Sequence, residues 1–426
     1  MATLIVDISF SGANTGTTLI LGDTTRGKIG TGTLGSGVEA DVVFNDVTSY
    51  VRSGSVERGR NRVDEPIIQY ETGTASVTLD NRDRRFDPTN LDGPYVSGGL
   101  TLVKPRRAIR FRATWNSVTY DLLRGFTSNF DVQWPDQSNQ ESVTEVPCSD
   151  AFKILSGINR IAVSAVGAGE DTGARINRIL DSAGWTSVDR LVSTGNSTVQ
   201  STTLGGNVLE ELQLVADTEI GELYIDGSGR VVFRNRTGIL TDDRSLTSQA
   251  IFDDDAGSGN LMYHGLGLST DDSTLANQVK ITRVGGATQI AEDTASQVEY
   301  YIKTYERDDI LLQTDATAND MADWLLYQSK DTELRFTEIT ILPQSDPDDL
   351  WPQVLGREIG DKITIIHRPP GGGDPIEREC FIRGIKHDFT PDTWSTTWAL
   401  QSAFKASFLV LDDPVLSIIG ANALGY

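Results

Sequence analysis

Six charged residues gather directly after a strand-like run in the N-terminal part of the chain. Apolar and small polar residues alternate from Ala75 to Leu79, a pattern typical of a half-buried strand. The chain then continues through the charged residues, with Asn81 and Phe86 among them: Asp80, Arg82, Asp83, Arg84, Arg85 and Asp87. Residues of these types could form a metal loop, a phosphate-binding patch, a catalytic cluster or a structural corner.

The arginines in this stretch argue against a metal site. A calcium loop of the EF-hand kind needs oxygen ligands at alternate positions, a glycine at the sixth position and a distal glutamate. Here Arg82, Arg84 and Arg85 occupy positions from which they would repel a cation. We therefore predict an Arg/Asp network that fixes a turn, either within one subunit or across a subunit interface.

The same stretch predicts how the turn is built. We expect Asp80 and Asp83 to pair with Arg82, Arg84, Arg85 or a neighbour's arginines. Phe86 should anchor the turn in the core, and the pair Asp87-Pro88 should stop the strand.

Other candidate sites are weaker. The loops Asp253–Asp255 and Asp346–Asp349 are acidic but lack the repeats of calcium-binding solenoids, so solvated charge is the simpler interpretation. The three histidines, His264, His367 and His387, have no zinc-site spacing. No nucleophile elbow or phosphate loop stands in the right context, and no carboxylate pair is singled out. We predict no catalytic residue, no metal and no cofactor, and hence no enzyme.

Composition narrows the class of protein further. The chain has 426 residues, enough for two or three domains, and its net charge of −23 argues against a dedicated nucleic-acid binder. Residues 51–112 hold 12 basic and 8 acidic residues, a net +4, which leaves −27 for the rest. Cys148 and Cys380 lie in strand-like runs and predict buried free thiols in a reducing compartment. We expect neither a signal peptide nor a membrane segment.

Hydrophobic periodicity predicts a mainly β chain with a smaller α/β part. Strand patterns follow one another from residue 67 to 148 and return after residue 334. Between them lie two helical patterns, one capped by Thr172 and Gly184, and a hairpin that turns at residues 226–229. A third helix is predicted within 316–329, and residues 27–37 and 369–374 read as loops.

Several stretches together resemble one family. “SGSVERGRNR”, “GTASVTLDNRDRRFDPTNLDGPY”, “PRRAIRFRATW” and “LLRGF” resemble the first part of minor tail proteins of long-tailed phages that infect actinobacteria. The runs “LEELQLVADTEIGELYIDGSGRVVFRNR”, “GDKITIIHRPPGGG” and “CFIRGIKHDFTPDTWSTTWAL” are similar to the same proteins. The resemblance covers most of residues 50–405, and this family is similar in turn to the baseplate-hub or tail-hub family.

The resemblance implies a fold with two tube-type β-barrel domains and a peripheral α/β domain. Strand blocks at both ends of the chain with an insert between them fit that layout. We therefore predict five parts: an N-terminal arm at 1–50, a first barrel at 51–160, an α/β domain at 161–245, a second barrel with one helix at 246–405, and a C-terminal docking tail at 406–426.

The resemblance also implies a structural role at the tail tip of a virion assembled in the host cytoplasm. Three copies would form a ring that continues the tail tube between neighbouring tail proteins and lets genomic DNA pass without specific binding. We expect the acidic part to face the lumen, the segment 51–112 to lie mostly at subunit contacts, and the loops 27–37 and 369–374 to reach neighbours. Charge reversal at Arg84 and Arg85 should block ring assembly and leave the monomer folded.

Three alternatives remain at this level. A distal tail protein would form a hexameric ring between tube and hub. A tail-associated hydrolase would cut cell-wall peptides or glycans and would favour a zinc or Cys/His signature. A receptor-binding adhesin would expose aromatic residues, whereas the tryptophans here fall mostly on strand or helix faces and predict core positions.

Overall fold

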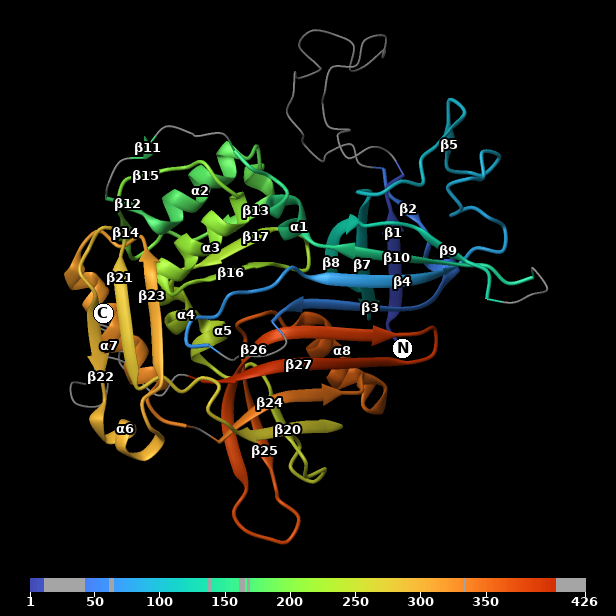
Figure 1. The fold of residues 1–426 in the computed structure, drawn as a ribbon. Coiled ribbons are helices and arrows are strands. Elements are labelled where there is room, and N and C mark those ends of the chain that lie inside the picture. The colour runs from blue at the N-terminus through green and yellow to red at the C-terminus, as the bar shows by residue number, and fades with distance from the viewer. Residues whose placement is uncertain are drawn as a thin grey trace.

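The computed structural model describes residues 1–10, 43–60, 65–135, 140–160, 165–166, 169–332 and 334–403. Strands dominate the described chain, and helices form a smaller part of it. Figure 1 shows two strand-rich blocks, one from each end of the chain; most helices gather on one side of them, whereas α8 lies among the strands of the second block. The predicted mainly β fold with a smaller α/β part is confirmed.

The first strand block comes from the N-terminal part of the chain. Its antiparallel order is β3-β4-β10-β8-β7-β1-β2, and β9 pairs with β10. Alternating apolar residues such as Ile109, Phe111 and Ala113 are buried, as their spacing predicts. The strands are β1 Thr3–Ile8, β2 Asn45–Asp46, β3 Val51–Gly59, β4 Thr74–Asp80, β7 Ala108–Trp115, β8 Val118–Thr127, β9 Asp131–Gln133 and β10 Val143–Ser149. A 3-10 turn, Thr48–Tyr50, precedes β3, and a small hairpin of β5 Val96–Ser97 and β6 Leu100–Thr101 lies beside the block.

The N-terminus differs from the predicted arm. Strand β1 pairs along its whole length with β7, and Val6 lies opposite Phe111. Val6 and Ile8 are fully buried, so residues 3–8 are part of the sheet. The run “LIVDISF” already had the apolar pattern of a strand. The predicted loop 27–37 lies outside the described residues.

The second strand block comes from the C-terminal part. It contains β18 Ile251–Asp253, β19 Leu261–Met262, β20 Gly265–Thr270, β24 Leu334–Ile341, β25 Lys362–His367, β26 Ile376–Phe389 and β27 Trp394–Ser402. Strand β26 also pairs with β3, from Phe389 opposite Gly54 to Gly384 opposite Gly59, which joins the blocks into one 15-stranded sheet. At Gly54 a Cβ atom would lie 2.7 Å from the Phe389 ring, so only glycine allows this approach.

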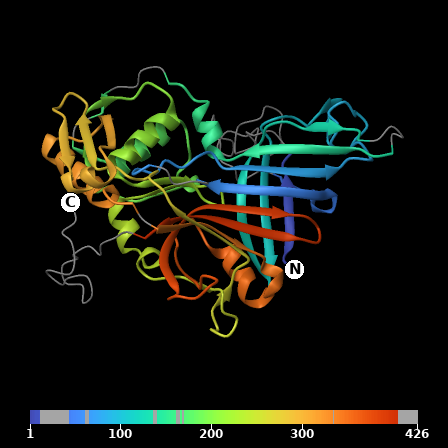
Figure 2. The same ribbon diagram turned by 60° about the horizontal axis from the view of Figure 1, so that its bottom comes forward.

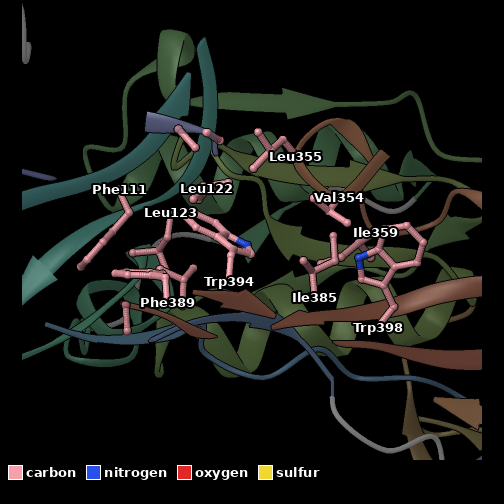
Figure 3. Close-up of a cluster of buried hydrophobic side chains, with 14 of the residues drawn as sticks. Phe111, Leu122, Leu123, Val354, Leu355, Ile359, Ile385, Phe389, Trp394 and Trp398 are labelled. Carbon is pink, nitrogen blue, oxygen red and sulfur yellow. The ribbon is translucent and has the colours of Figure 1, made fainter. Parts of the chain in front are cut away.

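One hydrophobic core extends beneath both blocks. Figure 2 shows β3 and β4 beside β26 and β27, with β1, β7 and β8 crossing behind them. Figure 3 shows the side chains of the two blocks in one cluster, with Phe111, Leu122 and Leu123 from the first and Ile385, Phe389, Trp394 and Trp398 from the second. The blocks are therefore held by shared packing as well as by the β3–β26 ladder.

Helix α8, Pro347–Gly356, was predicted as an acidic loop, and that prediction is wrong. Pro347 opens the helix and Asp348 and Asp349 lie in its first turn, where proline and acidic residues are favourable. Its apolar face buries Trp351 against Trp394 in an edge-on contact with ring centroids 5.5 Å apart. A 3-10 turn, Pro343–Ser345, precedes it.

An α/β insert follows the first block and has its own core. Hairpin β16 Glu222–Ile225 and β17 Val231–Arg234 is confirmed as predicted, with Ile225 opposite Val231. The first predicted helix begins after Asp171, whose carboxylate caps Ala174 N, rather than after Thr172. The other elements are α1 Ala151–Ser156, β11 Ala165–Val166, β12 Glu170–Asp171, α2 Thr172–Ser182, a 3-10 turn Ser187–Asp189, β13 Arg190–Val192, β14 Thr198–Val199, β15 Thr202–Thr203, α3 Val208–Glu219, α4 Arg236–Thr241 and α5 Asp243–Leu246.

A second small α/β unit lies within the span that was predicted as the second barrel. Strands β21 Gln278–Arg283, β22 Gln289–Glu292 and β23 Thr304–Ile310 form a separate sheet. Helix α7, Asp315–Ser329, packs on it through Ala318, Met321 and Leu325, and α6, Thr294–Tyr300, follows β22. The parallel β21–β23 pair requires this compact crossover, which the strand pattern alone did not reveal. The predicted domain boundaries stay a prediction.

Candidate functional site: a charged turn and a polar sheet face

The charged stretch forms a compact turn directly after β4. Asn81 is fully buried, and its Oδ1 accepts a hydrogen bond from Phe86 N at 2.9 Å. The Phe86 ring is also fully buried, with its centroid 5.6 Å from that of Tyr50 and 5.9 Å from that of Tyr95. The backbone of the turn is therefore fixed from inside the core.

The charged side chains of the turn pair with one another. Arg82 binds Asp80, and Arg85 binds Asp83 at 2.6 Å. Arg84 binds Asp87 at 2.9 Å. The structure thus brings all seven residues of the predicted network into one turn, and its role at a subunit interface stays a proposal.

Two further contacts tie this turn to the sheet. Arg52 of β3 donates to Asp80 at 3.1 Å and to Glu141 at 2.7 Å. Partial burial on its own would raise the pKa of Asp80, but hydrogen bonds from Arg82 and Arg52 outweigh it and lower that pKa to about 2. The Arg85 guanidinium lies 3.9 Å from the centre of the Tyr50 ring.

Replacing Asn81 tests the inner support of the turn. Asn81→Ala removes the acceptor for Phe86 N and leaves a buried donor unpaired, which we expect to cost about 1–3 kcal/mol of unfolding free energy. Chemical denaturation measures the change. The control is Asn319→Ala, which removes an exposed i,i+4 contact to Asp323 and should cost about 0.2–0.5 kcal/mol. An equal loss of unfolding free energy in both variants would contradict the role of Asn81 as the inner support of the turn.

A polar face extends over six adjacent strands, β24-β27-β26-β3-β4-β10. Val56, Val77 and Ile339 point into the core, so the residues that alternate with them point outward. Most outward residues are serine, threonine or acidic, with a single lysine: Ser55, Glu57, Thr74, Ser76, Thr78, Glu145, Glu338, Thr340, Lys386, Asp388, Ser395 and Thr397. We call these twelve residues the polar face.

Rows of the polar face cross the boundary between the two strand blocks. One row links Thr340, Thr397, Lys386, Glu57 and Thr74 as successive cross-strand partners. With four acidic residues and one lysine, the face carries a net charge of −3. The polar face is thus continuous across both strand blocks, carries mostly short side chains and is mildly acidic.

Buried charges join the α/β insert to the sheet. Arg383 of β26 is buried and binds Glu222 of the hairpin, and it also donates to the Tyr70 hydroxyl at 3.2 Å. The second Glu222 oxygen accepts from Arg234 at 2.9 Å. Burial alone would raise the pKa of Glu222, but Arg383 and Arg234 outweigh it and lower that pKa.

Two further ion pairs reinforce this junction. Arg58 of β3 binds Glu358 at 2.7 Å, and Arg244 of α5 binds Asp361 at 2.8 Å. Glu358 and Asp361 both belong to the connection between α8 and β25. Ion pairs therefore attach the insert to β26 and to the connection between α8 and β25, and the Arg58–Glu358 pair joins β3 of the first block to that same connection.

Asp150 lies where the first block continues into the insert. Its carboxylate accepts from Gly73 N at 2.6 Å and from Phe152 N at 2.9 Å, which caps α1. Burial raises its pKa to about 7. An acid whose folded pKa is raised contributes less stability as pH rises from its unfolded value of about 3.9 toward 7.

An asparagine at this position should therefore change the pH dependence of stability. The unfolding free energy of Asp150→Asn should rise relative to that of the parent chain as pH increases from 4 to 7, because the variant has no proton to lose. Denaturant titrations across this range measure it. Asp253→Asn is the control with the opposite shift: hydrogen bonds from Arg368 outweigh burial and lower the pKa of Asp253, so its contribution to stability changes below about pH 4 and this variant should show no rise between pH 4 and 7. A parallel trend in both variants would refute the assignment.

The acidic loop 253–255 is neutralised by the opposite segment. Arg368 binds both Asp253 and, at 2.8 Å, Asp254, and His367 Nδ1 lies 3.1 Å from Asp254. Residues 369–374 continue from there as an exposed loop. Within the described part of the chain, no group of three or more His, Cys, Asp or Glu residues has a metal-site arrangement.

His387 and the two cysteines are buried, whereas His264 is exposed. His387 is buried between Thr396 and Trp394, and burial lowers its pKa to about 3. Cys148 and Cys380 are buried free thiols, as predicted. Among the described residues, no helix is long and apolar enough to cross a bilayer.

Sequence comparison gives no relatives, whereas structural comparison does. No protein-family model matches the chain, and no curated protein matches it significantly. The tail protein from Neisseria meningitidis MC58 superposes with a TM-score of 0.55 at 11% identity, covering 94% of this chain and 96% of that one. The 43 kDa tail protein of prophage MuSo2 from Shewanella oneidensis gives 0.52 at 10% identity, covering 94% and 97%.

The chain has the fold of these two tail proteins. The predicted resemblance to tail proteins is thus confirmed at the level of the fold, and the origin in an actinobacterial phage stays a prediction. Sequence analysis missed the polar face, the Arg383–Glu222 junction and α8. The alternation of serine, threonine and glutamate along β3 and β4 was a signal for the face, but not for its continuation into β26 and β27.

Proposed function

We propose that this chain is a structural subunit of a phage tail hub, in which three copies close into a ring that continues the tail tube. The fold of the two tail proteins supports this assignment at the coarse level. The observation that carries the finer assignment is the polar face, whose rows cross from one strand block into the other. Each chain then contributes two blocks, and three chains contribute six, which matches a tube of sixfold geometry.

The chemistry of the polar face suits the wall of a DNA channel. Lysine and arginine bind phosphates because each neutralised phosphate releases counterions. The face offers one lysine among four acidic residues, and these repel a duplex over about 8 Å at physiological salt. Serine and threonine keep the wall hydrated without charge. DNA would therefore pass during ejection without being retained.

The mass and symmetry of the isolated assembly test this proposal. We expect native mass spectrometry to give three times the chain mass of 46.4 kDa, and electron microscopy to show a hollow ring. Six copies would instead favour a distal tail protein between tube and hub. A stable monomer at micromolar concentration, or a channel lined with lysine and arginine, would overturn the proposal. Cell-wall digestion should stay at background, since the proposed role needs no catalysis.

The charged turn is the proposed contact between copies. The Arg84 side chain is 57% exposed and binds Asp87 and, at 3.3 Å, the Thr89 hydroxyl of the same turn, whereas Arg85 stacks on the Tyr50 ring. Arg84→Glu is therefore the cleaner single variant of the predicted double charge reversal. We expect it to abolish the ring in sedimentation experiments while near-UV circular dichroism stays unchanged. Normal rings from this variant would place the interface elsewhere.

The proposed surroundings follow from this position. The ring would lie at the tail tip of the virion, below a tail tube or distal tail protein and above other tail-tip proteins. It would assemble in the host cytoplasm, and the C-terminal residues 406–426, outside the described part, would form a docking tail.

A further inference from the structure

A hollow of about 490 Å³ lies against the three-stranded sheet of the α/β insert. Leu191, Val232 and Tyr224 line it; they are cross-strand partners on β13, β17 and β16, so their side chains share one face of that sheet. The charged residues that line it are Asp226, Arg230, Arg234, Asp242, Arg244 and Glu358. Its volume lies within the range of roughly 300–1,000 Å³ that small-molecule pockets occupy.

The Tyr224 hydroxyl is an unused polar group in this hollow. Tyr224 is 2% exposed, yet its hydroxyl forms no hydrogen bond with any residue that the structure describes. Buried tyrosine hydroxyls usually have a partner. The neighbouring Tyr70, with its ring centroid 5.6 Å away, accepts a hydrogen bond from Arg383 at 3.2 Å. The Tyr224 hydroxyl is therefore left for a group that enters the hollow.

The charges around Tyr224 show which residues share this space with its hydroxyl. Burial raises the pKa of Tyr224, the Glu358 carboxylate raises it further, and the Arg244 guanidinium lowers it. The net effect is a raised pKa, so the hydroxyl keeps its proton and can both donate and accept a hydrogen bond.

Two charged side chains of the lining also have unused atoms. Arg244 donates through Nε to Asp361 at 2.8 Å and through Nη2 to Ile359 O at 2.6 Å, and its Nη1 has no partner among the described residues. Asp242 accepts from Arg234 through Oδ2 at 3.0 Å, and its Oδ1 likewise has no described partner. The lining thus offers one free donor, one free acceptor and one hydroxyl that can serve as either.

The lining carries no net charge, because its three basic residues balance its three acidic ones. Each charge is also paired individually: Arg230 binds Asp226 at 2.8 Å, and Glu358 binds Arg58 at 2.7 Å. Arg234, Arg244 and Asp242 have the partners given above. An ion that entered would lose its hydration without finding an unpaired opposite charge, so the chemistry favours a neutral polar ligand.

We propose that this hollow binds a neutral, hydroxyl-rich ligand of about the size of a disaccharide. The hydroxyl groups of a sugar donate and accept, as Arg244 Nη1, Asp242 Oδ1 and the Tyr224 hydroxyl together require. The C–H face of a sugar ring packs on the apolar side chains of Leu191 and Val232. This inference does not depend on the proposed ring.

Saturation-transfer NMR on the full-length chain tests this site. The probes are maltose, cellobiose and chitobiose, and inorganic phosphate and glycine are added as ionic competitors. We expect at least one disaccharide to give a saturable signal that neither competitor reduces. Tyr224→Phe should weaken its binding about threefold to tenfold, the worth of one neutral hydrogen bond. No saturable signal from any of the three sugars, or displacement by phosphate or glycine, would overturn the proposal.

Tyr70→Phe is the matched control. It removes the hydroxyl of the neighbouring ring, which does not line the hollow, so sugar binding should stay unchanged. Equal weakening in both variants would assign the effect to ring packing and refute the site. Chemical denaturation of the sugar-free Tyr224→Phe chain should give the parent midpoint, because no described residue uses that hydroxyl. A lower midpoint would mean that the hydroxyl is already bonded inside the protein, which would also refute the site.

Discussion

Arg383→Ala should lower the unfolding free energy by about 3–5 kcal/mol, because it leaves the Glu222 carboxylate with one partner fewer in a buried site. The side chain also donates to Gln401 at 2.7 Å and to the Tyr70 hydroxyl. Glu222 and Tyr70 are buried, so neither group regains full hydration when the guanidinium is lost, whereas Gln401 is only half-buried. Denaturant titration followed by tryptophan fluorescence measures the change.

Arg378→Ala on the same strand is the matched control. Arg378 is exposed and donates only to the neighbouring Glu377 O, so its loss should stay within about 0.5 kcal/mol. If Arg383→Ala were as mild as Arg378→Ala, the junction would not be held by buried charge. If Arg383→Ala, but not Arg378→Ala, unfolded in two transitions instead of one, that loss of cooperativity would also agree with a junction between insert and sheet.

If the chain forms the proposed ring, three lysines on the polar face should make that ring bind DNA. The variant Ser55→Lys, Ser76→Lys and Thr397→Lys would place nine new positive charges in the proposed trimer, along rows that face the proposed channel. If six to ten phosphates are contacted, affinity should fall roughly 10³–10⁵-fold between 50 and 200 mM salt. Fluorescence anisotropy with a short duplex measures both affinity and salt slope.

The control places the same charges on the insert. Ser187→Lys, Val188→Lys and Leu191→Lys are at exposed positions away from the face. We expect the parent ring to bind no duplex and the insert variant to bind weakly, with a smaller salt slope. Equal binding by both variants would mean that net charge, rather than the position of the face, governs contact with DNA.

Local features of the fold were predictable because they depend on neighbours in sequence. The hairpin at residues 226–229 follows from its turn residues, and the strand at 108–115 follows from alternation. Phe86 was predicted as a core anchor because it is the one large apolar residue in the charged stretch, and it is fully buried. The charged turn was predictable for the same reason: it begins where the alternation ends.

Features that depend on distant partners were not predictable. The polar face exists because β26 pairs with β3, and no pattern in either strand specifies the other. The Arg383–Glu222 pair joins a strand to a hairpin 161 residues earlier. Helix α8 was missed for a different reason. Its proline and the acidic residues of its first turn are also typical of a loop. Only the helical spacing of the apolar residues that follow in the sequence, such as Trp351, indicates a helix.

The ladder between β3 and β26 also constrains how the polypeptide acquires its shape. Gly54 pairs with Phe389, so during synthesis the edge of β3 stays unpaired until more than 300 further residues have been added and β26 is complete. Loop closure across so many residues slows folding, and the waiting edge is open to association with other nascent chains. Fragments that stop before β26 should consequently be insoluble, and nascent chains would gain from a chaperone that covers that edge.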